Sequence, residues 1–244
     1  MPKANYSDLR KKASGALRNL GMILNRKQVC ADVAPISSAA DQCNRQANDK
    51  VNSWGYDIAN LVFRPTLPPG TLPLKAKEFR LELSISVFGH FDCDIDDRFS
   101  RLEINVEKYA LGATGVELKS AWHIDRHTID TKKDSPHITD EIHPLYHFQF
   151  GGAKMTKPQH QHEGTLLLAP PRLMHPPMDG ILAIDFVLAN YAGSIWKSLR
   201  QDSEYNNLVL PQFDQIWKPY FASVAESWSN PKMNNSGYLC PFIF

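Results

Sequence analysis

The chain has 244 residues, of which 43% are hydrophobic and 22% are charged, and these ordinary globular values exclude wholesale disorder. A formal net charge of +1 gives no global attraction to nucleic acid or to an anionic membrane. No apolar run approaches the roughly 18 residues that a spanning helix needs, so no membrane partner is expected. The chain begins without a continuous apolar segment, and its four cysteines form no Cys-x-x-Cys pair. Both features favour a cytoplasmic protein with reduced thiols.

The first 64 residues are expected to form a helical N-terminal segment. Ser7 is a candidate N-cap, and apolar residues recur at helical spacing from Leu9 to Leu24. The other face is basic, because Lys and Arg outnumber acidic residues seven to one between Met1 and Lys27. Such a face can contact nucleic-acid phosphates, although a basic stripe is also typical of the solvated side of an amphipathic helix.

A second helix is predicted from about Ser38 to Phe63. It should stop there, because the residue before Pro65 disfavours helical geometry. The stretch 64–75 contains four prolines and a glycine, which indicates a rigid connector. We therefore divide the chain into residues 1–64 and 75–244, and expect the two parts to form one compact domain.

Residues 75–244 are expected to form an antiparallel sheet followed by helices. Apolar and polar residues alternate with a period of two in four stretches: 79–87, 101–109, 117–129 and 145–150. Short or moderate connections between successive strands favour an antiparallel meander.

Helical patterning returns after the sheet. Asp179 can cap the very apolar stretch 180–191, which should be buried against the sheet, so Asp185 inside it needs a partner. A short helix follows, and a last helix should start at Pro211 and kink or end at Pro219. The predicted class is α+β: a central antiparallel β-meander of about four strands, with N-terminal helices and with C-terminal helices packed on one face.

Histidines are concentrated in one part of the chain, since eight of the nine lie within residues 123–175. If the third and fourth predicted strands are neighbours, strand parity places five titratable side chains on one sheet face. They are His123, Asp125, His127, His143 and His147. Trp122, Phe148 and Phe150 then face the helices.

Such a histidine face has three interpretations. Neutral imidazole with carboxylate is the usual ligand set for zinc or iron, so a divalent transition metal is a candidate cofactor. The same groups could run metal-free acid–base chemistry, with Asp125 orienting one imidazole. They could also form a polar, water-facing surface with no further role.

Four further residues are weaker candidates. Arg172 lies in a proline-stiffened loop and could hold a phosphate, although a structural ion pair explains it equally well. His160, His162 and Glu163 offer metal-ligating atoms, but Pro158 and Gly164 favour a loop, where such a cluster is often only polar.

Two functions from different classes remain open. The first is ribonuclease-like phosphodiester cleavage, in which the histidines act as acid and base, Arg172 stabilises charge and the basic helix holds RNA. The second is a non-catalytic binding or sensor protein, whose histidine face contacts another protein chain or a small ligand. Phosphate-binding loops, nucleophile elbows and zinc-protease motifs are all absent from the sequence, so no motif decides between the two.

Overall fold

A computed structural model describes residues 5–45, 52–71, 75–92, 97–127, 143–151, 155, 172–229 and 239–240. Six strands in this part of the chain form one antiparallel sheet in sequence order, with helices before and after it. The predicted α+β class with a central antiparallel meander is therefore confirmed, with two more strands than expected. None of the helices described is long and apolar enough to cross a membrane.

The elements follow one another in a simple order. The first helices are α1 (Tyr6–Arg26) and α2 (Ala34–Asn44). The strands are β1 (Ser53–Phe63), β2 (Lys77–His90), β3 (Phe99–Leu111), β4 (Glu117–Arg126), β5 (Tyr146–Phe150) and β6 (Leu173–Met174). The C-terminal helices are α3 (Gly180–Tyr191), α4 (Gly193–Arg200), α5 (Ser203–Gln212), the π-helical turn η3 (Phe213–Trp217) and α6 (Lys218–Ser229).

Strand β1 corrects the predicted helix from Ser38 to Phe63, because α2 ends at Asn44 and the rest of that stretch is extended. The pairing of β1 with β2 shifts register between Ile58 and Leu61, which marks a β-bulge. The bulge places two buried apolar residues three positions apart, a spacing that imitates a helix. Pairing with β2 and burial of this face against the core outweigh the local preference.

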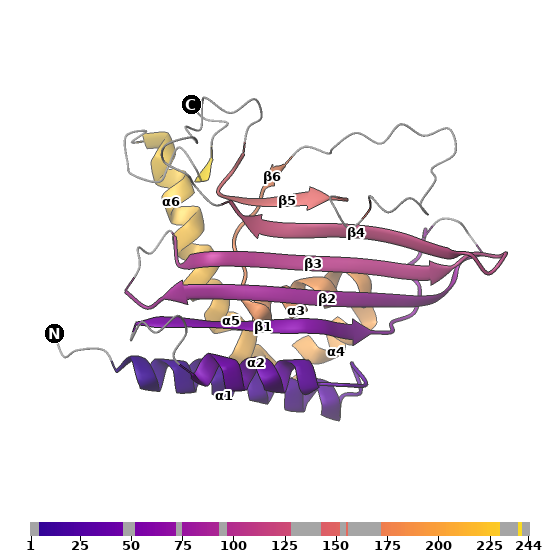
Figure 1. Cartoon of the computed structure of the whole chain (residues 1–244), viewed down its shortest axis with the longest axis horizontal. Coiled ribbons are helices and arrows are strands. Elements are labelled where there is room, and N and C mark those ends of the chain that lie inside the picture. The colour runs from indigo at the N-terminus through magenta and orange to yellow at the C-terminus, as the bar shows by residue number, and fades with distance from the viewer. Residues whose placement is uncertain are drawn as a thin grey trace.

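The sheet and the helices form two layers, with α3 to α6 behind the strands and α1 and α2 along the β1 edge (Figure 1). Alternate residues of each strand face the helices, so side chains such as Leu83 on β2 and Val106 on β3 are fully buried. One hydrophobic cluster joins α1, α2, the sheet and the C-terminal helices. The opposite face of the sheet is left for polar side chains.

The sequence pattern predicts that α3 is among the most buried elements, and the structure confirms this prediction. Asp179 caps it, and most of its residues are buried. The buried Asp185 accepts hydrogen bonds from Trp196 Nε1 at 2.9 Å, Arg200 at 2.8 Å and the Tyr205 hydroxyl at 3.1 Å. The expectation that this carboxylate needs partners is therefore confirmed.

The last helical region does not begin at Pro211 as predicted. Helix α5 begins at Ser203, contains Pro211, and continues through η3 into α6. Pro219 lies just after the turn in which the Lys218 N–H reaches back to the Phe213 carbonyl. A π-helical turn changes the hydrogen-bond pattern locally, so Pro219, which donates no N–H, is accommodated without ending the helix.

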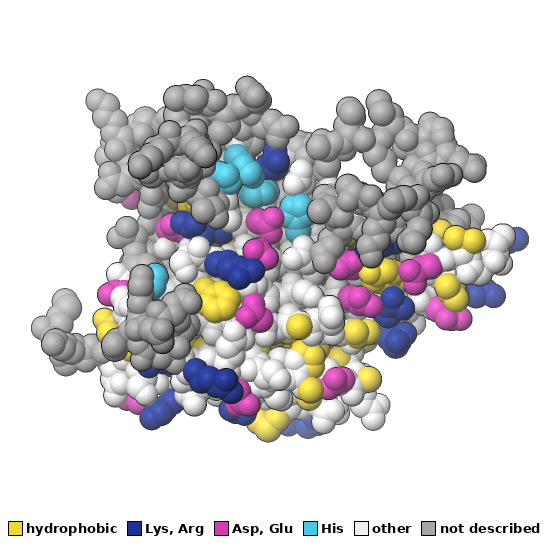
Figure 2. Space-filling view, in the orientation of Figure 1, with side chains coloured by type: hydrophobic (Ala, Val, Ile, Leu, Met, Phe, Trp, Pro, Cys, Tyr) yellow, Lys and Arg dark blue, Asp and Glu magenta, His cyan; other side chains and the backbone are white. Residues whose placement is uncertain are grey.

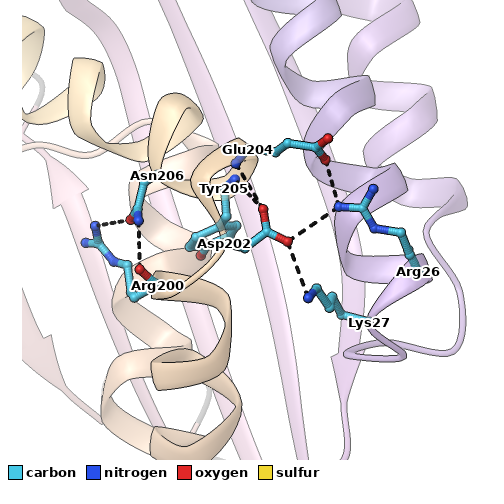
Figure 3. Close-up of polar contacts among 7 residues, drawn as sticks. All are labelled: Arg26, Lys27, Arg200, Asp202, Glu204, Tyr205 and Asn206. Atoms are coloured by element: carbon cyan, nitrogen blue, oxygen red, sulfur yellow. Dashed lines mark hydrogen bonds and ion pairs between the residues drawn. The ribbon is translucent and has the colours of Figure 1, made fainter.

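A polar network ties the C-terminal end of α1 to the start of α5 (Figure 3). Asp202 caps α5 by accepting the N–H groups of Glu204 and Tyr205 at 2.9 and 3.4 Å. Asp202 also pairs with Arg26 at 3.5 Å and with Lys27 at 3.3 Å, while Glu204 pairs with Arg26 at 2.7 Å. Water screens ion pairs of this kind, so they orient the two helices more than they stabilise the fold.

Candidate metal centre on the open sheet face

The predicted histidines lie together on the sheet face opposite the helices. They do so because β4 and β5 are paired neighbours, and because alternate residues of each strand point to the same face. His123 lies opposite Gln149, and Asp125 lies opposite His147. Cross-strand partners point to the same side of a sheet, so these four side chains share the open face. Figure 2 shows histidine, acidic and basic side chains together on this face.

The imidazoles form a continuous series of contacts. The ring centroids of His123 and His147 lie 6.3 Å apart, and those of His143 and His147 lie 4.6 Å apart. The rings of His127 and His143 are closest, at 3.9 Å. The expected adjacency of the four histidines with Asp125 is thus what the structure has, although a catalytic role for them stays a prediction.

Three of these residues converge as metal ligands do, and we call them the His–Asp–His triad: His123, Asp125 and His147. Each offers one ligand atom, and the three atoms all lie within 4.8 Å of one another. His123 Nε2 and Asp125 Oδ2 are 3.4 Å apart. Ligands on one zinc or iron ion, with bonds near 2.1 Å, lie at most about 4.2 Å apart, so small side-chain adjustments would close the triad on a cation.

The local backbone prepares His147 for this role. Its Nδ1 lies 3.2 Å from the Pro144 carbonyl oxygen, which can only accept, so Nδ1 carries the proton. The Nε2 lone pair is then available to a cation, an arrangement typical of metal-binding histidines. The side chain is only 3% exposed.

Burial also sets the charge states of the triad. Desolvation, with the neighbouring His143, His123 and Arg172, lowers the pKa of His147 to about 3, and the Pro144 carbonyl only partly opposes this. Desolvation raises the pKa of Asp125, and Glu103 adds to the effect while His123 opposes it. His147 is therefore neutral near pH 7, which suits a metal ligand better than a proton donor.

Arg172 is brought to the same region by β6, a strand that the sequence did not predict. β6 pairs with β5 so that Met174 lies opposite His147, and Arg172 immediately precedes it. The positive charge of Arg172 contributes to the lowered pKa of His147. The candidates His160, His162 and Glu163 lie outside the residues that the structure describes.

Sequence reasoning missed the contribution of the strands before β4. Glu103 on β3 lies opposite Asp125, and Ser86 on β2 lies opposite Glu103. The Ser86 hydroxyl is buried and has no hydrogen-bond partner among the described residues. One polar row thus crosses five strands: Asp57, Ser86, Glu103, Asp125 and His147. Extending the parity argument to the two earlier predicted strands would have found Ser86 and Glu103, but not Asp57, because β1 was predicted as a helix.

The basic face of α1 is less available to a partner than its sequence indicated. Arg18 pairs with Asp41, and Arg10 is buried, with a hydrogen bond to the Ser53 carbonyl at 3.3 Å. The basic residues at the end of α1 form the network of Figure 3. Acidic neighbours therefore neutralise much of this stripe.

Two clefts of the described region lie away from the histidines. One, of about 440 Å³, opens between the end of α1 and the α4–α5 connection, and its charged side chains are the ion pairs of Figure 3. A second, of about 470 Å³, lies between α1 and α5 and is lined by Met22, Ile23 and Leu208 among others.

Comparisons with known proteins identify no relative from which a function could be inferred. No protein-family model, curated protein or solved structure matches the chain. The functional argument therefore starts from the triad and its surroundings.

Proposed function

We propose that the His–Asp–His triad binds a divalent transition metal and that the protein uses it for ribonuclease-like cleavage of phosphodiesters. The observation that carries the proposal is the convergence of the three ligand atoms within 4.8 Å on one face of paired strands. Two imidazoles and one carboxylate leave coordination positions open, as catalytic metal sites do.

The chemistry follows from the residues around those open positions. A bound metal polarises a phosphate oxygen and lowers the pKa of a bound water toward neutrality. Arg172 adds positive charge beside His147, which favours an anionic substrate over a neutral one. RNA is the proposed substrate because its 2′-hydroxyl supplies an internal nucleophile, so the site has to manage only protons and charge.

The first experiment measures metal content and affinity. Purified protein is analysed by mass spectrometry for bound metals, and chelator-treated protein is titrated with Zn²⁺, Mn²⁺ and Co²⁺. Replacing a ligand in His123→Ala, Asp125→Asn or His147→Ala should weaken binding by more than the roughly 10–100-fold that loss of an outer-shell partner costs. His90→Ala is the matched control, since His90 lies on β2, outside the cluster, and its buried Nδ1 has no hydrogen-bond partner among the described residues.

The second experiment measures turnover on single-stranded RNA and DNA oligonucleotides, with and without chelator. Metal-dependent RNA cleavage that is lost in Asp125→Asn and kept in His90→Ala supports the proposal. Metal binding without cleavage of either nucleic acid would reject the enzyme and favour a binding or sensor protein. Absence of metal binding would reject the centre itself.

A further inference from the structure

We infer that Lys108 is a nucleophilic amine that reacts with aromatic aldehydes to form an imine, at a site on the helix-facing side of the sheet and separate from the triad. Lys108 lies on β3 two residues after Val106, so strand alternation points both side chains toward the helix layer. Val106 is fully buried, whereas Lys108 lies where α3 ends at Tyr191 and is only partly covered. Its amine is therefore both partly desolvated and reachable from solution.

Aromatic rings flank the Lys108 amine. Its Nζ lies 5.1 Å from the ring centroid of Tyr191 on α3 and 5.5 Å from that of Phe150 at the end of β5. Trp122 extends the aromatic lining, because its Nε1 donates to the Tyr191 hydroxyl at 2.7 Å. Phe150 is 49% exposed, so a flat ring from solution can stack against it beside the amine. These surroundings favour an aromatic ligand over an aliphatic one.

No carboxylate of the described residues pairs with Lys108. Within this part of the chain its Nζ has one hydrogen-bond partner, the Tyr191 hydroxyl oxygen at 3.4 Å. A ring face attracts an ammonium but replaces its lost hydration only in part, and burial lowers the pKa of Lys108 below its ordinary value. A larger neutral fraction makes the amine a better nucleophile near pH 7.

Lys119 on β4 provides the internal comparison. It forms an ion pair with Glu107. Burial disfavours its charge as well, but hydrogen bonds to Glu107 and Tyr109 outweigh this and raise the pKa of Lys119. Two lysines on neighbouring strands therefore differ in what accompanies their burial, which is a carboxylate for Lys119 and aromatic rings for Lys108. The amine of Lys119 should be unreactive and that of Lys108 reactive.

Tyr191 is placed to supply the proton that imine formation needs. Its oxygen accepts from Trp122 and from Lys108, so its own O–H points away from both and can donate to a carbonyl oxygen. Burial raises the pKa of Tyr191, although the Trp122 hydrogen bond opposes this, so the hydroxyl stays protonated near pH 7.

The reaction needs no oxidant or reductant. The amine lone pair forms a bond to the carbonyl carbon, while the carbonyl oxygen takes the Tyr191 proton and the first amine proton replaces it on Tyr191. The C–O bond then breaks and the oxygen leaves as water, with the second amine proton delivered by the same route. A C=N bond to Lys108 remains, and the two amine protons have left in the water.

Reductive trapping tests the inference on the full chain. The protein is incubated near pH 7 with benzaldehyde and cyanoborohydride, which reduces an imine to a stable benzylamine, and peptide mapping by mass spectrometry follows each lysine over time. Lys108 should be labelled at least about tenfold faster than Lys119 and than Lys11, whose side chain is exposed. Labelling of Lys108 at or below the rate of Lys11 overturns the inference. Acetaldehyde has no ring and should lose most of this selectivity, and equal selectivity with both aldehydes overturns the aromatic class.

Two conservative variants test the surroundings of the amine. Tyr191→Phe keeps the ring and removes the hydroxyl, so labelling of Lys108 should slow about tenfold or more, and the wild-type rate in this variant overturns Tyr191 as the proton donor. Lys119→Arg keeps a cation beside Glu107 and should leave labelling of Lys108 within about twofold of wild type. Far-ultraviolet circular dichroism checks the fold of each variant. The assay contains neither metal nor nucleic acid, so its outcome is independent of the function proposed for the triad.

Discussion

Asp179 is a buried carboxylate whose charge should destabilise this fold near neutral pH. Its carboxylate caps α3 by accepting the Leu182 N–H at 2.9 Å, yet the residue is only 8% exposed. Desolvation raises its pKa from 3.8 to about 6, although the backbone N–H groups of α3 oppose the shift. The nearby Tyr56 and Cys43 stay neutral, because burial raises the pKa of Cys43 to about 12 and that of Tyr56 well above 10.

The direction of the effect follows from proton linkage. Below pH 3.8 the carboxyl is protonated in both the folded and the unfolded chain, so its contribution to stability is fully present. As the pH rises toward 6, the unfolded chain ionises first, and the free energy of unfolding falls. A shift of about two pKa units at 1.36 kcal/mol each amounts to roughly 3 kcal/mol, lost by the time the pH exceeds the folded-state pKa.

Asp179→Asn removes the charge and keeps an oxygen to cap α3, so it should remove this loss. We expect the variant to match wild type near pH 4 and to exceed it by up to about 3 kcal/mol near pH 8, or roughly 6–12 °C in Tm. Urea unfolding between about pH 4 and pH 8, monitored by tryptophan fluorescence, measures the difference in the free energy of unfolding between the variant and wild type. The other titrating groups are the same in both proteins, so their contributions cancel. Asp179→Ala is the control, because loss of the cap should reduce the gain by about 1 kcal/mol. A difference that does not grow between about pH 4 and pH 6 would refute the reasoning.

Two further predictions concern stability. Asp185→Ala should lower the free energy of unfolding by about 3–5 kcal/mol, because the partly buried Arg200 loses the carboxylate that lies 2.8 Å away. Denaturant unfolding measures this loss, and a loss below about 1 kcal/mol would show that solvent replaces the ion pair. Gly89→Ala should cost about 1–3 kcal/mol, since a Cβ there would lie 2.3 Å from the Arg98 carbonyl oxygen. Gly193→Ala, with nothing within 4 Å of the added Cβ, should be neutral or stabilising by up to about 1 kcal/mol, and equal effects of the two changes in thermal melts would contradict the steric argument.

The histidine face could be predicted because two simple rules act together. Alternation with a period of two assigns each residue of a strand to one face, and consecutive strands of a meander are neighbours. His123 and Asp125 on β4 therefore had to meet His147 on β5 once those two strands paired, and they do. The rules involve backbone geometry alone, so they need no knowledge of packing.

Strand β1 shows where the same rules fail. Its buried residues Tyr56, Ile58, Leu61 and Phe63 follow spacings of two, three and two, because the register shifts at the bulge. Asn60, inside the bulge, has a positive φ of 52°, and its N–H donates to the Ser84 hydroxyl on β2 at 3.2 Å. A bulge is fixed by its partner strand, so periodicity within β1 alone gives no sign of it.

Burial, more than residue identity, decides what the histidine face can do. A water-facing imidazole titrates near its ordinary pKa of about 6.5, which suits acid–base chemistry in the physiological range. His147 is instead almost fully buried and holds its Nδ1 against the Pro144 carbonyl, and the neighbouring rings and Arg172 further disfavour its protonated form. Strand parity contains none of this information, because it assigns a face without saying what covers it. The same residues in the same register therefore suit a cation site better than the acid–base chemistry that the sequence also left open.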